Sequence, residues 1–157
     1  MKKFIQKKLK EQKGMTLIEL LAVIVIIAII AAIAIPAIGN IIENSRYGAV
    51  KSDASNVLSA ANIYFTENPE DADGKATLTE LKAGYLQSAG IFDKVPTAAD
   101  VYVTKSNPNT LTSPAVKYSG DKTITFTGAT QDAINSNTTK GSAVKTVTIT
   151  TTTTTTN

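Results

Sequence analysis

The chain has 157 residues, a formal net charge of +3, and no cysteine, histidine or tryptophan. Without cysteine it can form neither a disulfide nor a thiolate site. Without histidine the Ser-His-Asp and Cys-His catalytic arrangements and the usual zinc sites are excluded. The charge is uneven, because residues 1–14 carry six lysines against one glutamate whereas the remainder is slightly acidic. This composition argues against an enzyme and predicts no cofactor, no metal site and no nucleic-acid partner.

The basic segment is followed by an apolar one, residues 15–38, which only Thr16, Glu19 and Pro36 interrupt. As a helix this segment would be about 36 Å long, enough to cross the hydrocarbon core of a bilayer. Lysines that flank such a helix stay on the cytoplasmic side. We therefore predict a membrane-spanning helix over residues 15–38, with residues 1–14 in the cytoplasm.

Three plainer interpretations of the apolar segment compete, and the least favoured is a buried core helix, because a 16-residue all-apolar run is too long for one in so small a protein. The other two are a plain transmembrane anchor and the hydrophobic region of a cleaved signal peptide, for which Ala32-Ile33-Ala34 supplies a cleavage site. Neither of these two accounts for Glu19. A charged side chain within a membrane helix costs about 2.5–3.5 kcal/mol at mid-bilayer on insertion scales, so such residues are candidates for function.

The stretch KGMTLIELLAVIVIIAIIAAIAIP, residues 13–36, resembles the N-terminus of type IV pilins and pseudopilins. That family has a basic leader ending in glycine, a hydrophobic first mature residue, a glutamate at the fifth mature position, and a long apolar helix with a proline. Here these positions are Gly14, Met15, Glu19 and Pro36. The resemblance implies cleavage by a prepilin peptidase between Gly14 and Met15, followed by methylation of the new amine of Met15.

The resemblance also suggests a role for the charge of Glu19. In a filament core, a lone buried charge is costly but an ion pair is tolerable. We expect Glu19 to pair with the Met15 amine of a neighbouring subunit. A contact within its own chain is the alternative, since the two residues are one helical turn apart. Pro36 lacks a backbone donor and should kink the helix. The family's filaments often show the helix melted ahead of this proline, but no glycine lies between Met15 and Pro36 to assist melting here.

Beyond the apolar segment, residues 39–68 continue the helix as an amphipathic outer half. Apolar residues recur there at spacings of three and four and predict a buried stripe. The stripe comprises Val50, Ala54, Val57, Leu58, Ala61, Tyr64 and Phe65. The helix should end near Asn68-Pro69. Residues 69–90 then form an acidic loop, which lacks the spacing of a calcium loop, and a short helix from Thr77 or Thr79 to Gln87, with Thr77 and Glu80 as a capping box.

Residues 91–157 are rich in β-formers and end in a threonine run. The predicted strands are residues 101–103, 115–118, 123–127 and 144–150, with a hairpin turn at Ser119-Gly120-Asp121. The run from Thr150 to Thr156 either extends the last strand, forms a free tail or carries glycans. The fold class is therefore α+β, a pilin fold in which a long N-terminal helix packs on a small antiparallel β-sheet head.

These features together predict a structural subunit of a type IV pilus. The resemblance implies that it first inserts in the membrane and then polymerises with itself into an extracellular filament for adhesion, motility or aggregation. Its partners would be a prepilin peptidase, a membrane platform protein and an assembly ATPase. The alternatives are a competence or type II secretion pseudopilin and, in another class, an anchored extracellular domain that does not polymerise. The lack of a disulfide favours a Gram-positive source, and the lack of an Asp-Pro-Trp-Gly segment weighs against a secretion pseudopilin.

Overall fold

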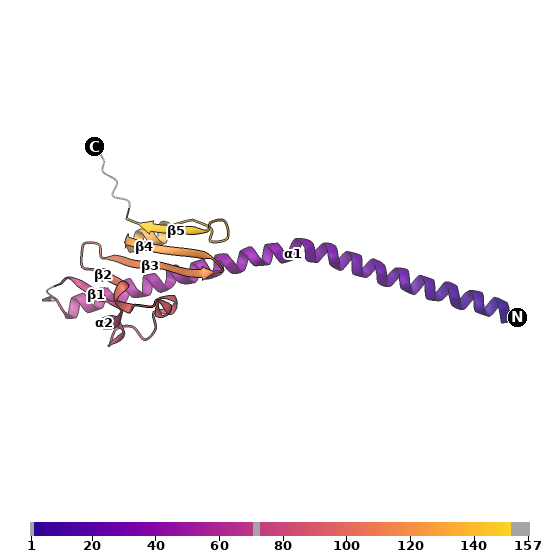
Figure 1. Cartoon of the computed structure of the whole chain (residues 1–157), viewed down its shortest axis with the longest axis horizontal. Coiled ribbons are helices and arrows are strands. Elements are labelled where there is room, and N and C mark those ends of the chain that lie inside the picture. Colours follow the sequence, from indigo (N-terminus) through magenta and orange to yellow (C-terminus); the bar gives the residue numbers. More distant parts are fainter. Residues whose placement is uncertain (1, 71–72, 152–157) are drawn as a thin grey trace, which may run out of the picture. The chain divides into compact units, whose positions relative to one another are not determined.

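The computed structural model describes residues 2–70 and 73–151, with side chains from Thr16 onward (Figure 1). The chain divides into two compact units, residues 1–40 and residues 41–157. Helix α1 (Lys2–Glu67) supplies all of the described first unit and the first part of the second. The second unit, called the head below, contains every other element of the described structure.

Within the head, α1 packs one face against the sheet, as its apolar spacing predicts. Six members of the predicted stripe are at most 6 % exposed and Tyr64 is half-buried, whereas polar residues such as Ser52 and Asn56 lie on the exposed face. The helix ends at Glu67, because Pro69 disfavours helical angles at Asn68. The N–H and the side-chain amide of Asn68 both donate to Tyr64 O, at 2.8 and 2.9 Å, and cap this end.

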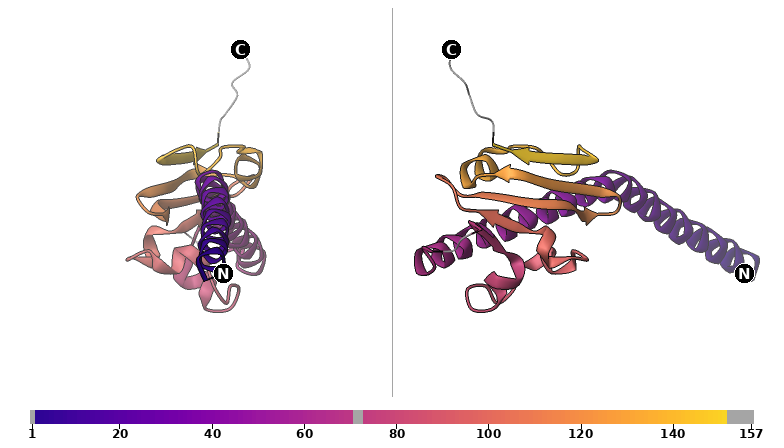
Figure 2. Two further views of the ribbon diagram at one scale, coloured as in Figure 1. Left: turned by 90° about the vertical axis from the view of Figure 1, so that its right-hand side faces the viewer. Right: turned by 60° about the vertical axis from the view of Figure 1, so that its left-hand side comes forward.

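One five-stranded sheet covers that face of α1 (Figure 2). Its strands are β1 (Lys75–Thr77), β2 (Tyr102–Thr104), β3 (Thr110–Ser119), β4 (Lys122–Ala129) and β5 (Thr146–Thr150). They lie side by side in chain order, β1-β2-β3-β4-β5. The predicted hairpin turn is confirmed: Ser119 pairs with Lys122, and Gly120 takes the positive φ of 51° that the turn requires.

The prediction of a wholly antiparallel sheet is wrong at one pair of strands. Strand β5 runs parallel to β4, with Thr123 opposite Thr146 and Thr127 opposite Thr150. A parallel neighbour needs a crossover that returns the chain to the start of the previous strand. Here the segment between β4 and β5 provides that crossover, and it includes helix α3 (Gln131–Ser136). The sheet is therefore antiparallel in three of its pairings and parallel in the fourth.

The short helix α2 (Leu78–Lys82) begins as predicted and ends earlier. The Thr77 side chain accepts the N–H of Glu80, and the Glu80 carboxylate accepts the N–H of Thr77, so the capping box is present. The helix stops at Lys82 instead of near Gln87, because the N–H groups of residues 85 and 86 both donate to the carbonyl oxygen of Leu81 in a tight turn.

The head has one hydrophobic core, which lies between α1 and the sheet. Its largest fully buried side chains are Phe92, Phe126, Leu78, Leu81, Leu111, Ile124, Ile134, Val57, Val101 and Val103. The rings of Phe92 and Phe126 lie 5.8 Å apart between centroids. Phe92 comes from a 3₁₀ turn at Gly90–Lys94, which the sequence pattern did not reveal. Of the threonine run, Thr150 ends β5 and residues 152–157 lie outside the described structure.

Candidate functional site

The N-terminal unit presents uncovered apolar side chains. Every Leu, Ile and Val from Leu17 to Ile38 is at least 50 % exposed within the chain. An 18-residue window of α1 has a mean hydropathy of 3.2 and no buried side chain. By length and composition this helix is able to cross a membrane. A stretch that is apolar on all sides must be covered by lipid or by other protein chains.

All four residues singled out in the sequence lie on α1. Gly14 and Met15 have helical backbone, and Glu19 follows Met15 by one turn. The Glu19 side chain is exposed and makes no hydrogen bond or ion pair with any residue that the structure describes. Pro36 lies within the helix, which continues through it without interruption. Thus no melted segment precedes Pro36, and the kink at this residue stays a prediction.

Where α1 begins its course through the head, side chains of the helix bind the start of β4 and the loop before β5. Glu43 forms an ion pair with Lys122, the first residue of β4, at 2.7 Å. The Lys122 ammonium also donates to the carbonyl oxygens of Ser142 at 2.6 Å and Gly141 at 3.3 Å. The side-chain oxygen of Asn44 accepts the N–H of Ser142 at 2.9 Å. The contacts of Glu43 and Asn44 join residues 79 and 98 positions apart, and no local pattern in the sequence predicts them.

Two tyrosines complete this region. The Tyr47 hydroxyl donates to Asn137 Oδ1 at 2.7 Å, and the Tyr118 hydroxyl donates to Gly141 O at 2.8 Å. The two rings pack edge to face, with centroids 5.4 Å apart. Burial, with a smaller contribution from Tyr118, raises the pKa of Tyr47 to about 12. Burial also raises the pKa of Tyr118, although the nearby Lys122 ammonium partly opposes this. Both hydroxyls are therefore structural donors at neutral pH.

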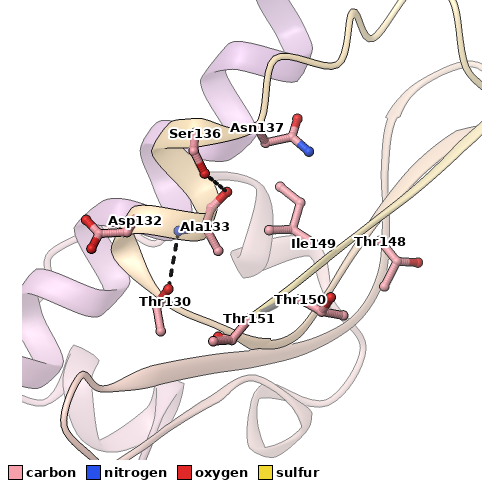
Figure 3. A pocket seen from close by; sticks show the side chains of 9 residues that line it. All are labelled: Thr130, Asp132, Ala133, Ser136, Asn137, Thr148, Ile149, Thr150 and Thr151. Carbon is pink, nitrogen blue, oxygen red and sulfur yellow. Dashed lines mark hydrogen bonds between the residues drawn. The ribbon is translucent and has the colours of Figure 1, made fainter. Parts of the chain in front are cut away.

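A hollow of about 420 Å³ lies between α3 and β5 (Figure 3). Its lining consists of Thr130, Asp132, Ala133, Ser136, Asn137, Thr148, Ile149, Thr150 and Thr151. Thr130 uses its hydroxyl to accept the N–H of Ala133, so it caps α3. The lining has a single carboxylate, Asp132, and no basic side chain. No group of three or more His, Cys, Asp or Glu side chains among the described residues is placed to hold a metal ion.

The N-terminal residues match a known family model. Residues 9–35 fit the prokaryotic N-terminal methylation motif, a span that contains the basic-to-apolar transition together with Gly14, Met15 and Glu19. This match supports a relation of the chain to type IV pilins and pseudopilins, which the motif itself covers only at the N-terminus. No curated protein and no solved structure matches the chain.

The remaining observations agree with the architecture of a pilin-like protein. A long N-terminal helix, apolar in its first part, is followed by a mostly antiparallel sheet, which is the α+β arrangement predicted from the sequence. Type IV pilins and pseudopilins, which share this motif, are structural subunits. The exposed apolar helix and the motif together fit a protein anchored in a membrane.

Proposed function

We propose that this pilin-like chain is the structural subunit of a type IV pilus. The leader, residues 1–14, is removed between Gly14 and Met15, the new Met15 amine is methylated, and the mature chain polymerises through its N-terminal helix. The observation that carries the proposal is the methylation motif at residues 9–35, which continues directly into a helix with uncovered apolar side chains. In a filament these side chains lose their contact with water or lipid and pack against other copies.

Glu19 is the proposed assembly residue of this helix. The helix core of a filament is dry, so a single carboxylate there requires a cationic partner. Among the described residues Glu19 has no such partner in its own chain. Cleavage after Gly14 creates a cationic amine at Met15, which is present in every subunit. A pair between Glu19 of one subunit and the Met15 amine of the next neutralises both charges and sets the axial register.

The proposed life cycle begins in the membrane and ends outside the cell. Before assembly, residues 15–38 span the bilayer, the lysine-rich leader lies in the cytoplasm and the head lies outside. A prepilin peptidase, a membrane platform protein and an assembly ATPase are the expected partners. The finished pilus would serve adhesion, surface motility or aggregation. The lack of cysteine supports a Gram-positive source for this pilus.

The first test is the mass of the mature protein, isolated from filaments sheared off the cell surface. We expect a chain that begins at Met15 and carries one additional methyl group, within filaments visible by electron microscopy. An intact leader would support a plain anchor, and loss of the apolar segment would support a secreted protein. Methylated subunits confined to the membrane, or to very short filaments, would support a pseudopilin in place of a pilus subunit.

The second test concerns Glu19. Glu19→Gln removes the charge while it preserves size, so we expect normal membrane insertion and loss of filaments. Asp121→Asn is the matched control, because it neutralises an exposed carboxylate in the β3–β4 turn and should leave filaments unchanged. Normal filaments from Glu19→Gln would refute the proposed pair.

A further inference from the structure

The head carries a basic groove beside α1. It has a volume of about 560 Å³ and is lined by Arg46, Ala49, Val50, Asp53, Gly90, Ile91, Lys94, Lys117 and Tyr118. The lining comes from α1, from the 3₁₀ turn at Gly90–Lys94 and from β3. Three of these side chains are cationic, and one is anionic. Because they belong to separate elements, the sequence shows them only as scattered charges.

The cations of this groove are free to bind a partner. Lys94 and Lys117 are exposed and form no hydrogen bond or ion pair within the described parts of the chain. Arg46 makes one long contact, 3.5 Å, with the hydroxyl of Ser119. The single acid, Asp53, accepts the N–H of Ile91 with its Oδ2 at 2.9 Å and keeps its charge, so it offsets one of the three cations. The groove thus presents an excess of unpaired positive charge next to apolar side chains.

The opposite end of α1 in the head has the complementary charge. The acidic segment, Glu67 to Asp73, carries four carboxylates in sequence and no basic residue. Of its described members, Glu67, Glu70 and Asp73 are exposed. Glu67 accepts the Tyr85 hydroxyl at 2.8 Å and Asp73 accepts the N–H of Lys75 at 2.8 Å, and neither contact cancels a charge.

Nearby lysines reduce the acidic excess without removing it. Lys105 donates to the carbonyl oxygen of Pro69 at 2.9 Å, and Lys75 lies over the ring of Tyr102, 4.9 Å from its centroid. Both lysines therefore have partners of their own in the head. With four carboxylates against these two ammonium groups, the acidic segment retains a net negative charge.

The acidic segment cannot reach the groove of its own head. Asp53 and Glu67 are fourteen positions apart on α1, which at 1.5 Å per residue is about 21 Å of rigid helix. We infer that the basic groove of one head receives the acidic segment of a second copy of this chain. Such a contact joins two different surfaces, so it leaves a free groove at one end and a free acidic segment at the other. Such a head-to-tail contact gives an open filament wherever the rotation between successive copies does not close a ring.

This inference rests on the proposed function, since it supposes that the chain polymerises. It adds a contact between heads to the proposed contact between N-terminal helices. Opposite charges across an interface favour one register and orientation and disfavour others. We accordingly assign the groove and the acidic segment the task of fixing how neighbouring heads are oriented, while the apolar helices supply most of the association energy.

Crosslinking within filaments tests the contact directly, because the chain has no native cysteine. The variant with both Lys117→Cys and Glu70→Cys should give a ladder of covalent oligomers when sheared filaments are treated with a short bis-maleimide. Each single-cysteine variant should stay monomeric. The matched control pairs Glu70→Cys with Lys145→Cys, an exposed lysine outside the groove, and should also stay monomeric.

A charge exchange provides a second measurement. Lys117→Glu and Glu70→Lys should each lower the yield of sheared filaments, by roughly tenfold, since each places like charges opposite one another. The double variant should restore the yield, and Lys145→Glu should not change it. Restoration separates a paired contact from a general effect on folding, which two reversals would worsen.

The outcomes separate this contact from the proposed function. Filaments that assemble but give no Lys117–Glu70 ladder overturn the contact and leave the pilus assignment intact. So does a Lys117→Glu variant that assembles normally yet no longer binds vesicles of anionic lipid, which would assign the groove to lipid headgroups. A wild-type chain that is absent from surface filaments overturns both proposals.

Discussion

Gly90 offers a quantitative test of how the head is packed. It opens a 3₁₀ turn with a φ of +60°, and a Cβ added there would lie 2.1 Å from Oδ2 of Asp53. In Gly90→Ala the left-handed backbone costs about 1–2 kcal/mol. Displacement of Asp53 breaks its hydrogen bond with the N–H of Ile91, and a bond to a charged group contributes about 1.5–3 kcal/mol. We therefore expect Gly90→Ala to lower the free energy of unfolding by roughly 2.5–5 kcal/mol.

Two companion variants separate these contributions. Gly128 has the same φ of +60° but nothing within 4 Å of an added Cβ, so Gly128→Ala should show the backbone cost alone. In an Asp53→Ala background the collision at Gly90 is absent. There, Gly90→Ala should cost no more than Gly128→Ala, which makes the set a double-mutant cycle.

The assay is urea unfolding of the full chain in detergent micelles, followed by tyrosine fluorescence. This signal reports on the head, because all five tyrosines lie between residues 47 and 118 and the chain has no tryptophan. The reasoning is refuted if Gly90→Ala and Gly128→Ala cost the same, or if removal of the Asp53 carboxylate leaves the cost at Gly90 unchanged.

Three further predictions use the same unfolding assay. Phe126→Ala should cost about 3–5 kcal/mol, because Phe126 is fully buried against Phe92. Ile63→Ala is the control, because this side chain is 53 % exposed, and it should lower the free energy of unfolding by well under about 1 kcal/mol. Similar losses for the two variants would contradict the assigned core. Lys122→Met should lower the free energy of unfolding more than Glu43→Gln does, because the Lys122 ammonium also donates to the carbonyl oxygens of Gly141 and Ser142. Equal losses of stability would mean that the ion pair alone matters. The head should keep its stability up to the ordinary tyrosine pKa of 10.0 and lose it as pH rises toward about 12, since the folded state holds the Tyr47 proton more tightly than the unfolded state does. Tyr47→Phe should reduce this slope, and an unchanged slope would assign it to other groups.

The features that the sequence predicted correctly depend on nearby residues. The stripe from Val50 to Phe65 follows the period of one helix, and its burial needs only a sheet to cover it. The capping box of Thr77 and Glu80 joins residues three positions apart. In the same way, Gly120 marks a turn whose two strands are adjacent in the chain. In each case the physical cause lies within a few residues.

The features that the sequence did not reveal depend on residues far apart. The alternation in Thr146–Thr150 shows which side chains face the core, but it is the same for a parallel and an antiparallel neighbour, so the direction of β5 was predicted wrongly. Strand β1 has only three residues, too few for a pattern. Lys122 finds Glu43 79 positions away, and the basic groove combines three separate elements. Such sites exist only after the chain has folded.

The order of the strands has a consequence for how the head is made. Because β1 to β5 lie in the sheet in the order of the chain, each strand pairs with the one that emerged just before it. A chain that leaves a ribosome or a translocation channel N-terminus first can thus add strands one by one to α1, which emerges before them, and no earlier pairing has to open. The addition of β5 is the exception. The α3 crossover must form first, and only then can Val147 and Ile149 of β5 cover the core. Pairing of Thr146–Thr150 with β4 is therefore the step that completes the fold of the head.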